Sequence, residues 1–179
     1  KFSSPHFPKK EGGKMRTNRK RRKEHKTDYG MRLKLLKSGM PRIVVRKTNK
    51  YLIAQAVTSK SAQDSIIVGV TSGDLLNHGW DKNMKGSLKS IPAAYLTGIL
   101  LGNRIKEKKQ DKNEFILDLG MNIKRYKGRL YAVAKGVVDS GIKLKVNKKV
   151  FPDEARLNGE HINEKLKQNI EKIKSNLTK

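Results

Sequence analysis

The chain has 179 residues, and its 42 Lys and Arg outnumber its 16 Asp and Glu, which gives a formal net charge of +26 at pH 7. Because it has no cysteine, a disulfide-stapled secreted scaffold and a thiolate zinc site are excluded. The longest apolar run, residues 91–101, is well short of the ~20 residues of a membrane-spanning helix, and residues 1–13 lack the apolar region of an export signal. We therefore expect a cytoplasmic protein that has no membrane partner and binds a polyanion.

Residues 1–28 are the first expected unit, a basic arm with eleven Lys and Arg and three acids. It has almost no aliphatic side chain to bury and its charges repel, so we expect it to be extended until an anion neutralises it. Such runs also serve as nuclear import signals or solvated tails, but the remaining residues carry +18 of the net charge, so polyanion binding is expected of the whole molecule. The candidate contacts of the arm are Arg16, Arg19, Lys20, Arg21, Arg22, Lys23 and Lys26.

The second expected unit is an α/β core over residues 29–150. Apolar and β-branched runs predict strands at residues 42–48, 51–58, 65–71 and 114–119. The first two strands form a hairpin about Asn49-Lys50, and the third, which has no polar face, is expected at the centre of the sheet. Caps and apolar spacing predict helices at residues 29–38, 72–77, 91–108, 128–141 and 160–176. This order predicts a mixed sheet covered by helices, followed by a C-terminal helical extension over residues 151–179 that packs back on the core.

The register of the hairpin assigns a face to each of its side chains. A two- or four-residue turn pairs Arg46 with Ile53. One face is then small and apolar and suits a core, with Ile43, Val45, Lys47, Leu52, Ala54 and Ala56. The other face combines guanidinium, hydroxyl, amide and tyrosine groups: Arg42, Val44, Arg46, Thr48, Tyr51, Ile53, Gln55 and Val57. Guanidinium groups bind phosphate and a tyrosine ring stacks on an exposed base, so this face suits RNA; for the hairpin alone, a solvated face is an equally good interpretation.

Basic residues in two further segments extend the candidate surface. Arg32 lies on the helix that leads from the arm into the core. Farther along the chain, Lys124, Arg125 and Arg129 surround Tyr126, so donors and a stacking ring are again combined. This third segment is weak evidence alone, but it places additional donors where the same nucleic acid could reach them.

Signals for catalysis are weaker. The four histidines are far apart in the sequence and show no metal-ligand spacing. Asp118 is the one acid expected within a strand, and Arg42 and Arg46 stand where a two-metal nuclease needs carboxylates. The pair Gly98 and Gly102 predicts close approach of a helix to the sheet or to another backbone rather than chemistry. We expect no enzyme activity, cofactor or metal, and keep an Mg²⁺-dependent nuclease as the enzymatic alternative.

Three separated stretches, Arg19–Val57, Pro92–Gly102 and Phe151–Ile162, closely resemble one protein family. It is the archaeal branch of the large-subunit ribosomal protein that is numbered eighteen in bacteria and five in eukaryotes. The similarity covers roughly residues 16–162, in the same order and with similar spacing. Residues 1–14 and the loop 81–90 depart from the family pattern, so no contacts are transferred to them.

The resemblance implies a structural role in the ribosome with no catalysis. Its members bind 5S ribosomal RNA and help seat it in the central protuberance, on a fold similar to ribonuclease H, beside large-subunit ribosomal RNA and neighbouring ribosomal proteins. The matching positions in this chain are Arg19 to Lys26 in the arm, Arg42, Lys47, Asn49, Lys50 and Gln55 in the hairpin, and Tyr126, Gly128 and Arg129. The alternative is a general nucleic-acid-binding protein outside the ribosome.

Overall fold

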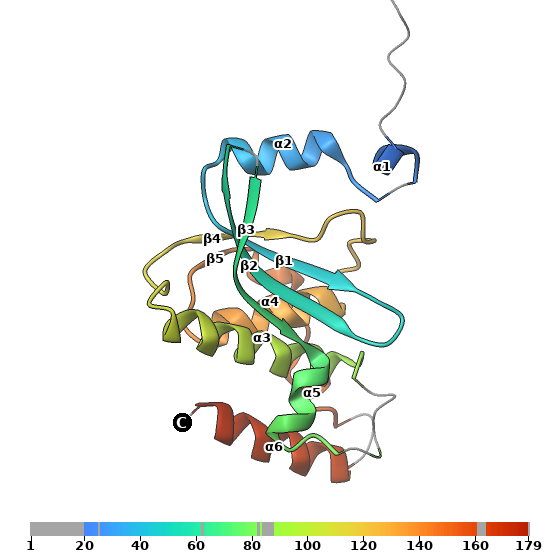
Figure 1. Ribbon diagram of the computed structural model, residues 1–179. Coiled ribbons are helices and arrows are strands. Elements are labelled where there is room, and N and C mark those ends of the chain that lie inside the picture. Colours follow the sequence, from blue (N-terminus) through green and yellow to red (C-terminus); the bar gives the residue numbers. More distant parts are fainter. Residues whose placement is uncertain are drawn as a thin grey trace, which may run out of the picture.

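The computed structural model describes residues 20–24, 26–61, 63–81, 83, 88–160 and 164–178. In chain order its elements are α1 (Lys20–Lys23), α2 (Tyr29–Lys37), β1 (Arg42–Lys47), β2 (Leu52–Lys60), β3 (Gln63–Thr71), η1 (Ser72–His78), α3 (Ile91–Glu107), β4 (Phe115–Asp118), α4 (Arg129–Asp139), β5 (Leu144–Lys145), η3 (Lys148–Val150), α5 (Glu154–Leu157) and α6 (Glu164–Thr178). Figure 1 shows the sheet between α2 on one side and α3 with α4 on the other, and α6 beneath α3.

The five strands form one mixed sheet in the order β3-β2-β1-β4-β5. Strands β1, β2 and β3 are antiparallel neighbours, whereas β4 is parallel to β1 and β5 is parallel to β4. The α/β class and the mixed sheet are therefore confirmed. The two-residue β5 and the short α5 had no predicted counterpart, because both are too short to show a period in the sequence.

The position predicted for the third strand is wrong. Strand β3 lies at the edge of the sheet, and β1 takes the centre between β2 and β4. Val68 and Val70 of β3 are buried, but Ile66 is 57% exposed. The apolar run predicted a strand buried on both faces, but other elements of the fold cover only part of one face of β3.

The predicted hairpin register is confirmed. Arg46 pairs with Ile53, and the Thr48 amide donates to the Tyr51 carbonyl oxygen at 2.9 Å. The apolar residues of the predicted core face are fully buried: Ile43, Val45, Leu52, Ala54 and Ala56. Lys47, assigned to the same face, is exposed because it stands at the end of β1 beyond the covering helices.

Helices α2 and α3 begin where their capping residues indicate, and α3 packs as its glycines indicate. The Asp28 carboxylate accepts hydrogen bonds from the amides of the first turn of α2, and the Ser90 hydroxyl does the same for α3. Gly98 of α3 lies against Gly136 of α4, where a Cβ on Gly98 would come within 3.0 Å of the Gly136 Cα. Of the two predicted alternatives, the structure confirms close approach to another backbone at Gly98, and that backbone is α4; Gly102 instead faces the Ser140 side chain.

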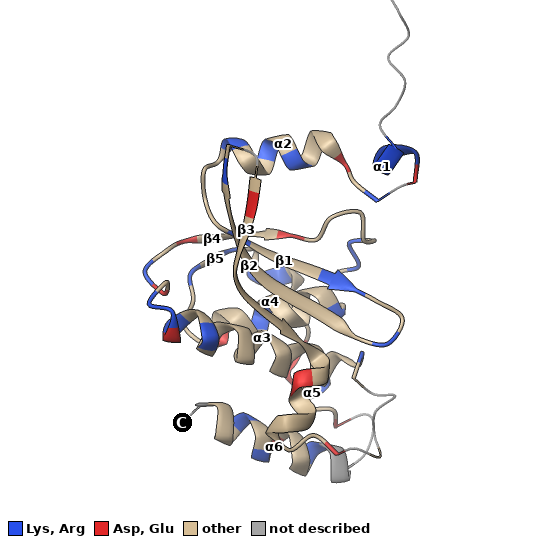
Figure 2. Ribbon diagram, in the orientation of Figure 1, with Lys and Arg blue, Asp and Glu red and all other residues tan. Residues whose placement is uncertain are grey.

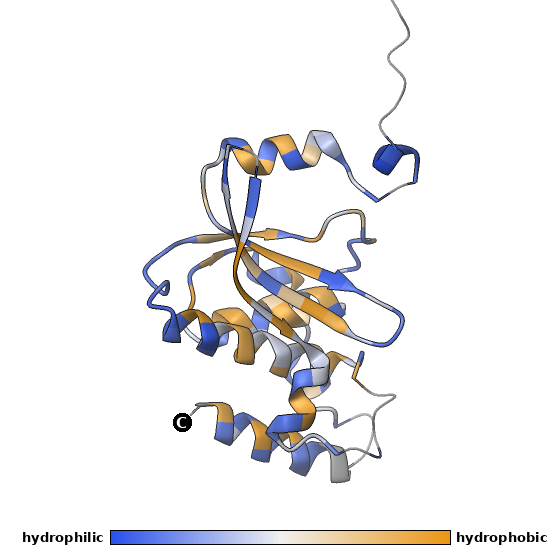
Figure 3. Cartoon of the chain, viewed as in Figure 1, coloured by the Kyte–Doolittle hydropathy of each residue, from blue (hydrophilic) through white to orange (hydrophobic). Residues whose placement is uncertain are grey.

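Two outlying segments complete the chain. Within the expected arm, Lys20–Lys23 form the helical turn α1 rather than extended chain, consistent with the good helix propensity of Lys and Arg; residues 1–19 lie outside the described residues. At the other end, Ile170 and Ile173 of α6 are buried in the same core as the sheet. Figure 3 shows the apolar positions of α6 turned toward the domain. The predicted return of the final helix to the core is confirmed.

In the part of the chain that the structure describes, no helix is long and apolar enough to cross a membrane. The same residues contain no group of three or more His, Cys, Asp or Glu side chains arranged to hold a metal ion.

Candidate nucleic-acid interface

The outer face of the sheet carries a chain of alternating charges. Arg42 is only 2% exposed, and its guanidinium donates to Asp118 Oδ2 at 3.1 Å, to Asp64 Oδ1 at 2.7 Å and to Ser59 Oγ at 2.8 Å. A guanidinium that is removed from water needs such partners. The prediction that Arg42 contacts RNA therefore disagrees with the structure, because this group is enclosed and engaged by two carboxylates.

Arg32 extends the cluster to helix α2. Its guanidinium donates to Asp64 Oδ2 at 2.8 Å, and this hydrogen bond raises the pKa of Arg32. Burial alone would raise the pKa of Asp64, but the hydrogen bonds from Arg32 and Ser59 and the charge of Arg42 outweigh burial, so the pKa of Asp64 is lowered. Arg32 thus links α2 to the first half of β3. Like Arg42, it is not part of the proposed interface.

Arg46 is the member of the cluster that reaches the surface. Its side chain is 39% exposed, and it donates to the carbonyl oxygens of Val45 and Asp118 at 2.9 and 2.8 Å and to the Asp118 carboxylate at 3.2 Å. Gly120, with a φ of +57°, leaves room for this group, since a Cβ there would lie 2.9 Å from the central guanidinium carbon. One edge of the guanidinium is thereby fixed, and the edge that faces solvent can bind a phosphate.

The end of the hairpin presents several polar groups. Thr48 closes the turn, because its hydroxyl donates to the Tyr51 carbonyl oxygen and accepts from the Tyr51 amide, both at 2.8 Å. Asn49 and Lys50 are exposed, and Tyr51 is 43% exposed. Gln55, farther along β2, lies over Gly69 of β3, which has no side chain to cover it. Thr48 therefore shapes the turn, and its neighbours supply the groups that a nucleic acid can reach.

The segment after β4 faces the hairpin across a groove of about 550 Å³. Lys47 of the hairpin and Arg125, Lys127 and Arg129 of the segment all line it, together with Arg156 of α5. Lys127 is held by the Asp153 carboxylate at 2.9 Å. This arrangement explains the two conflicting assignments of Lys47: its side chain belongs to the core face by register, yet past the helices that face opens onto a basic groove.

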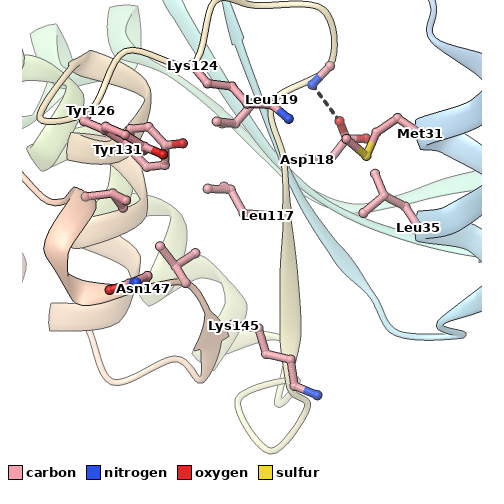
Figure 4. A pocket seen from close by; sticks show the side chains of 13 residues that line it. Met31, Leu35, Leu117, Asp118, Leu119, Lys124, Tyr126, Tyr131, Lys145 and Asn147 are labelled. Carbon is pink, nitrogen blue, oxygen red and sulfur yellow. Dashed lines mark hydrogen bonds between the residues drawn. The ribbon is translucent and has the colours of Figure 1, made fainter.

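A smaller pocket of about 360 Å³ lies on the other side of Tyr126. In Figure 4, Met31 and Leu35 of α2 lie to one side of β4, and Tyr126 lies to the other with Tyr131. The Asp118 carboxylate points toward α2 and accepts from the Gly120 amide at 2.8 Å, the bond drawn in the figure. Since Asp118 is also paired with two arginines, this pocket offers no free carboxylate among its described residues.

Three of the basic segments lie on the same side of the molecule. Figure 2 shows α1, the hairpin end and the segment after β4 on the same side of the view, each rich in Lys and Arg. In α1, Lys20, Arg21, Arg22 and Lys23 are all exposed. Arg21 donates to the Thr27 hydroxyl at 2.9 Å, which shapes the connection to α2. Arg16 and Arg19 lie outside the described residues, and Lys26 is exposed and paired with Glu24 at 2.9 Å.

Sequence reasoning missed one member of this surface and one member of the core. Arg156 was not singled out, because it is an isolated arginine with Asp153 and Glu154 before it and Glu160 after it. Trp80 lies outside every predicted helix and strand, yet it is 2% exposed and belongs to the core. No periodic signal marks either position, since both are placed by the packing of distant segments.

Comparison with known proteins gives a consistent result. A family described as ribosomal large subunit proteins 60S L5 and 50S L18 matches residues 13–115. The large ribosomal subunit protein uL18 of Korarchaeum cryptofilum is 44% identical over 150 residues, which are 84% of this chain and 74% of the relative. The uL18 of Methanoculleus marisnigri is 43% identical over 145 residues, 81% and 79% of the two chains. That of Methanoregula boonei is 38% identical over 166 residues, 89% and 92% of the two chains.

Proposed function

Because the chain belongs to the family of ribosomal large subunit proteins 60S L5 and 50S L18, we propose that it binds 5S ribosomal RNA and helps hold it in the central protuberance. The role is structural: it is carried out within the ribosome, beside large-subunit ribosomal RNA and neighbouring ribosomal proteins. The proposed units are the arm at residues 1–28, the α/β core at 29–150 and the helical extension at 151–179.

The observation that carries the proposal is that three exposed basic segments lie on the same side of the fold, although other Lys and Arg lie on α2, at the end of α3 and on α6. Arg46, Lys47 and Lys50 of the hairpin, the exposed residues of α1 and the segment 124–129 all lie on that side. Such a surface neutralises successive phosphates and releases their counterions. Tyr51 and Tyr126, 43% and 70% exposed, add rings that can stack on unpaired bases or lie on ribose.

The fold and the charges on its sheet together bear on the proposed role. The strand order, with β1 to β3 antiparallel and β4 and β5 parallel to β1, supports a ribonuclease H-like architecture. In a nuclease of that kind, carboxylates would have to converge at the sheet to hold metal ions. Here Asp118 lies between Arg42 and Arg46 and is neutralised by them, which favours a platform for RNA over a hydrolytic site.

The test is footprinting of 5S ribosomal RNA with and without the purified full chain. We expect protection confined to a defined set of nucleotides, and weak competition by an unrelated RNA duplex at the same salt concentration. If the unrelated duplex competes as well as 5S RNA, the protein is instead a general nucleic-acid binder, because non-specific affinity comes from charge alone.

A further inference from the structure

The segment 121–126 combines exposed apolar side chains with the basic groove. Of the seven large hydrophobic residues that are exposed among the described residues, three lie here: Met121 at 48%, Ile123 at 88% and Tyr126 at 70%. All three line the groove that Lys47 and Arg129 also line. Exposed apolar side chains gathered in one place mark a contact site rather than ordinary surface.

Most cations of the groove are not neutralised within the described residues. Lys127 is paired with Asp153, but Lys47, Arg125, Arg129 and Arg156 have no ion-pair partner there, and no Asp or Glu lines the groove. Cations from three parts of the chain, the hairpin, the segment after β4 and α5, therefore line the groove and favour a bound anion.

The backbone of the segment is fixed rather than adaptable. The Lys127 amide donates to the Val150 carbonyl oxygen at 2.9 Å, and Lys127 itself has a φ of +54°. A Cβ on Gly128 would lie 2.8 Å from the Arg125 carbonyl oxygen, so the turn requires glycine at that point. The Tyr126 ring rests near the Tyr131 ring, with centroids 6.2 Å apart, and its other surface is open.

We propose that this groove binds unpaired nucleotides of the RNA, with a base turned out against Tyr126 and Ile123 and the adjoining phosphates on Lys47, Arg125, Arg129 and Arg156. This inference rests on the proposed function. A duplex offers phosphates but keeps its bases stacked, so it would leave the apolar side chains in water. Unpaired nucleotides satisfy both halves of the site, because bases stack on aromatic rings while the backbone follows the cations. Lys47 joins the groove to the hairpin end, so the same RNA molecule can reach both.

The experiment compares 5S ribosomal RNA binding and footprints for the full chain and three variants. Tyr126→Leu removes the ring without changing charge, and we expect roughly tenfold weaker binding with an unchanged salt slope. The double variant Lys47→Gln and Arg156→Gln removes charge from opposite walls, and we expect a salt slope less steep by about 1.4 to 1.8. Both variants should lose protection of the same unpaired nucleotides. Tyr126→Phe keeps the ring and should bind as the wild type does.

The matched control is Lys108→Gln with Lys112→Gln, which removes two exposed charges, one at the C-cap of α3 and one in the turn that follows, away from the hairpin end. It should retain every protection at the groove. The proposal is overturned if the control loses the same protections, if the nucleotides affected by the groove variants are base-paired, or if those variants bind like the wild type, as a groove for an acidic segment of a neighbouring protein would. Failure of the wild type to protect 5S RNA would instead remove the proposed function itself.

Discussion

The guanidinium of Arg42 lies 3.1 Å from the carboxylate of Asp118, across the parallel strands β1 and β4. Both side chains are nearly enclosed, at 2% and 9% exposed. Arg46 approaches the same carboxylate from the solvent side at 3.2 Å. The two arginines lie on the same face of β1 but have different roles. Arg42, the inner one, stabilises the sheet, and Arg46, the outer one, is held in position at the surface.

Removal of the inner arginine should destabilise the fold. Arg42→Met leaves the buried Asp118 without its enclosed partner, and we expect the free energy of unfolding to fall by about 3 kcal/mol. Urea unfolding followed by the fluorescence of Trp80, the single tryptophan, which is 2% exposed, measures this change. Arg46→Met is the matched control, and with its half-exposed side chain it should cost about 1 kcal/mol or less. Equal losses for the two variants would contradict the assignment of roles.

The Asp64 carboxylate should make stability depend on pH in the acid range. The pKa of Asp64 is lowered in the folded state, because hydrogen bonds from Arg32 and Ser59 and the charge of Arg42 outweigh the effect of burial. Its contribution is therefore present above the pKa of the unfolded chain, ordinarily about 3.9, and is lost as the pH falls through the folded pKa. We expect Asp64→Asn to lower stability at pH 7 and to reduce the further loss between pH 4 and pH 2. Asp111→Asn, on an exposed turn, should leave the wild-type profile unchanged; an identical profile for Asp64→Asn would show that the cluster does not couple to folding.

The contact between α3 and α4 should depend on two glycines. A Cβ on Gly98 would meet the Val133 carbonyl and come within 3.0 Å of the Gly136 Cα, and neither backbone can move without separating the helices. We expect Gly98→Ala to cost about 1 to 3 kcal/mol of unfolding free energy by overpacking. Gly69→Ala is the control, since its Cβ would lie 3.7 Å from the Gln55 side chain. Urea unfolding compares the two, and a stable Gly98→Ala protein would mean that the helices are less tightly packed.

The sequence was sufficient for features that depend on neighbours along the chain. Asp28 and Ser90 indicated where helices begin, and the two-residue turn at Asn49-Lys50 fixed which side chains of β1 share a face. The face of a strand on which a side chain lies, however, does not determine how far that side chain is exposed to solvent. Arg42 shares its face with Arg46, yet Asp118 and Asp64 come from strands distant in the sequence and enclose only Arg42. No local pattern reports such pairing.

The same limit applies to the candidate interface. The basic run 19–23 and the basic residues next to Tyr126 in the sequence could be recognised from composition alone. The groove was not, because Lys47, Arg129 and Arg156 are brought together only when the hairpin, α4 and α5 pack. Likewise, the edge position of β3 depends on which strands pair with β1, and that pairing is a long-range choice.

The basic arm should set the salt dependence of RNA binding. Residues 1–26 carry eleven Lys and Arg, and a segment that neutralises about six phosphates contributes roughly −4 to −5 to the slope of log K against log salt. Deletion of residues 1–26 should flatten the slope for 5S ribosomal RNA by about that amount. Deletion of residues 1–14 removes only four of these cations and leaves the run 19–23 intact, so it should change the slope much less. Filter binding across a salt series distinguishes the two variants. An unchanged slope after the longer deletion would place the arm outside the interface, and Arg46 and the groove would then have to account for the affinity.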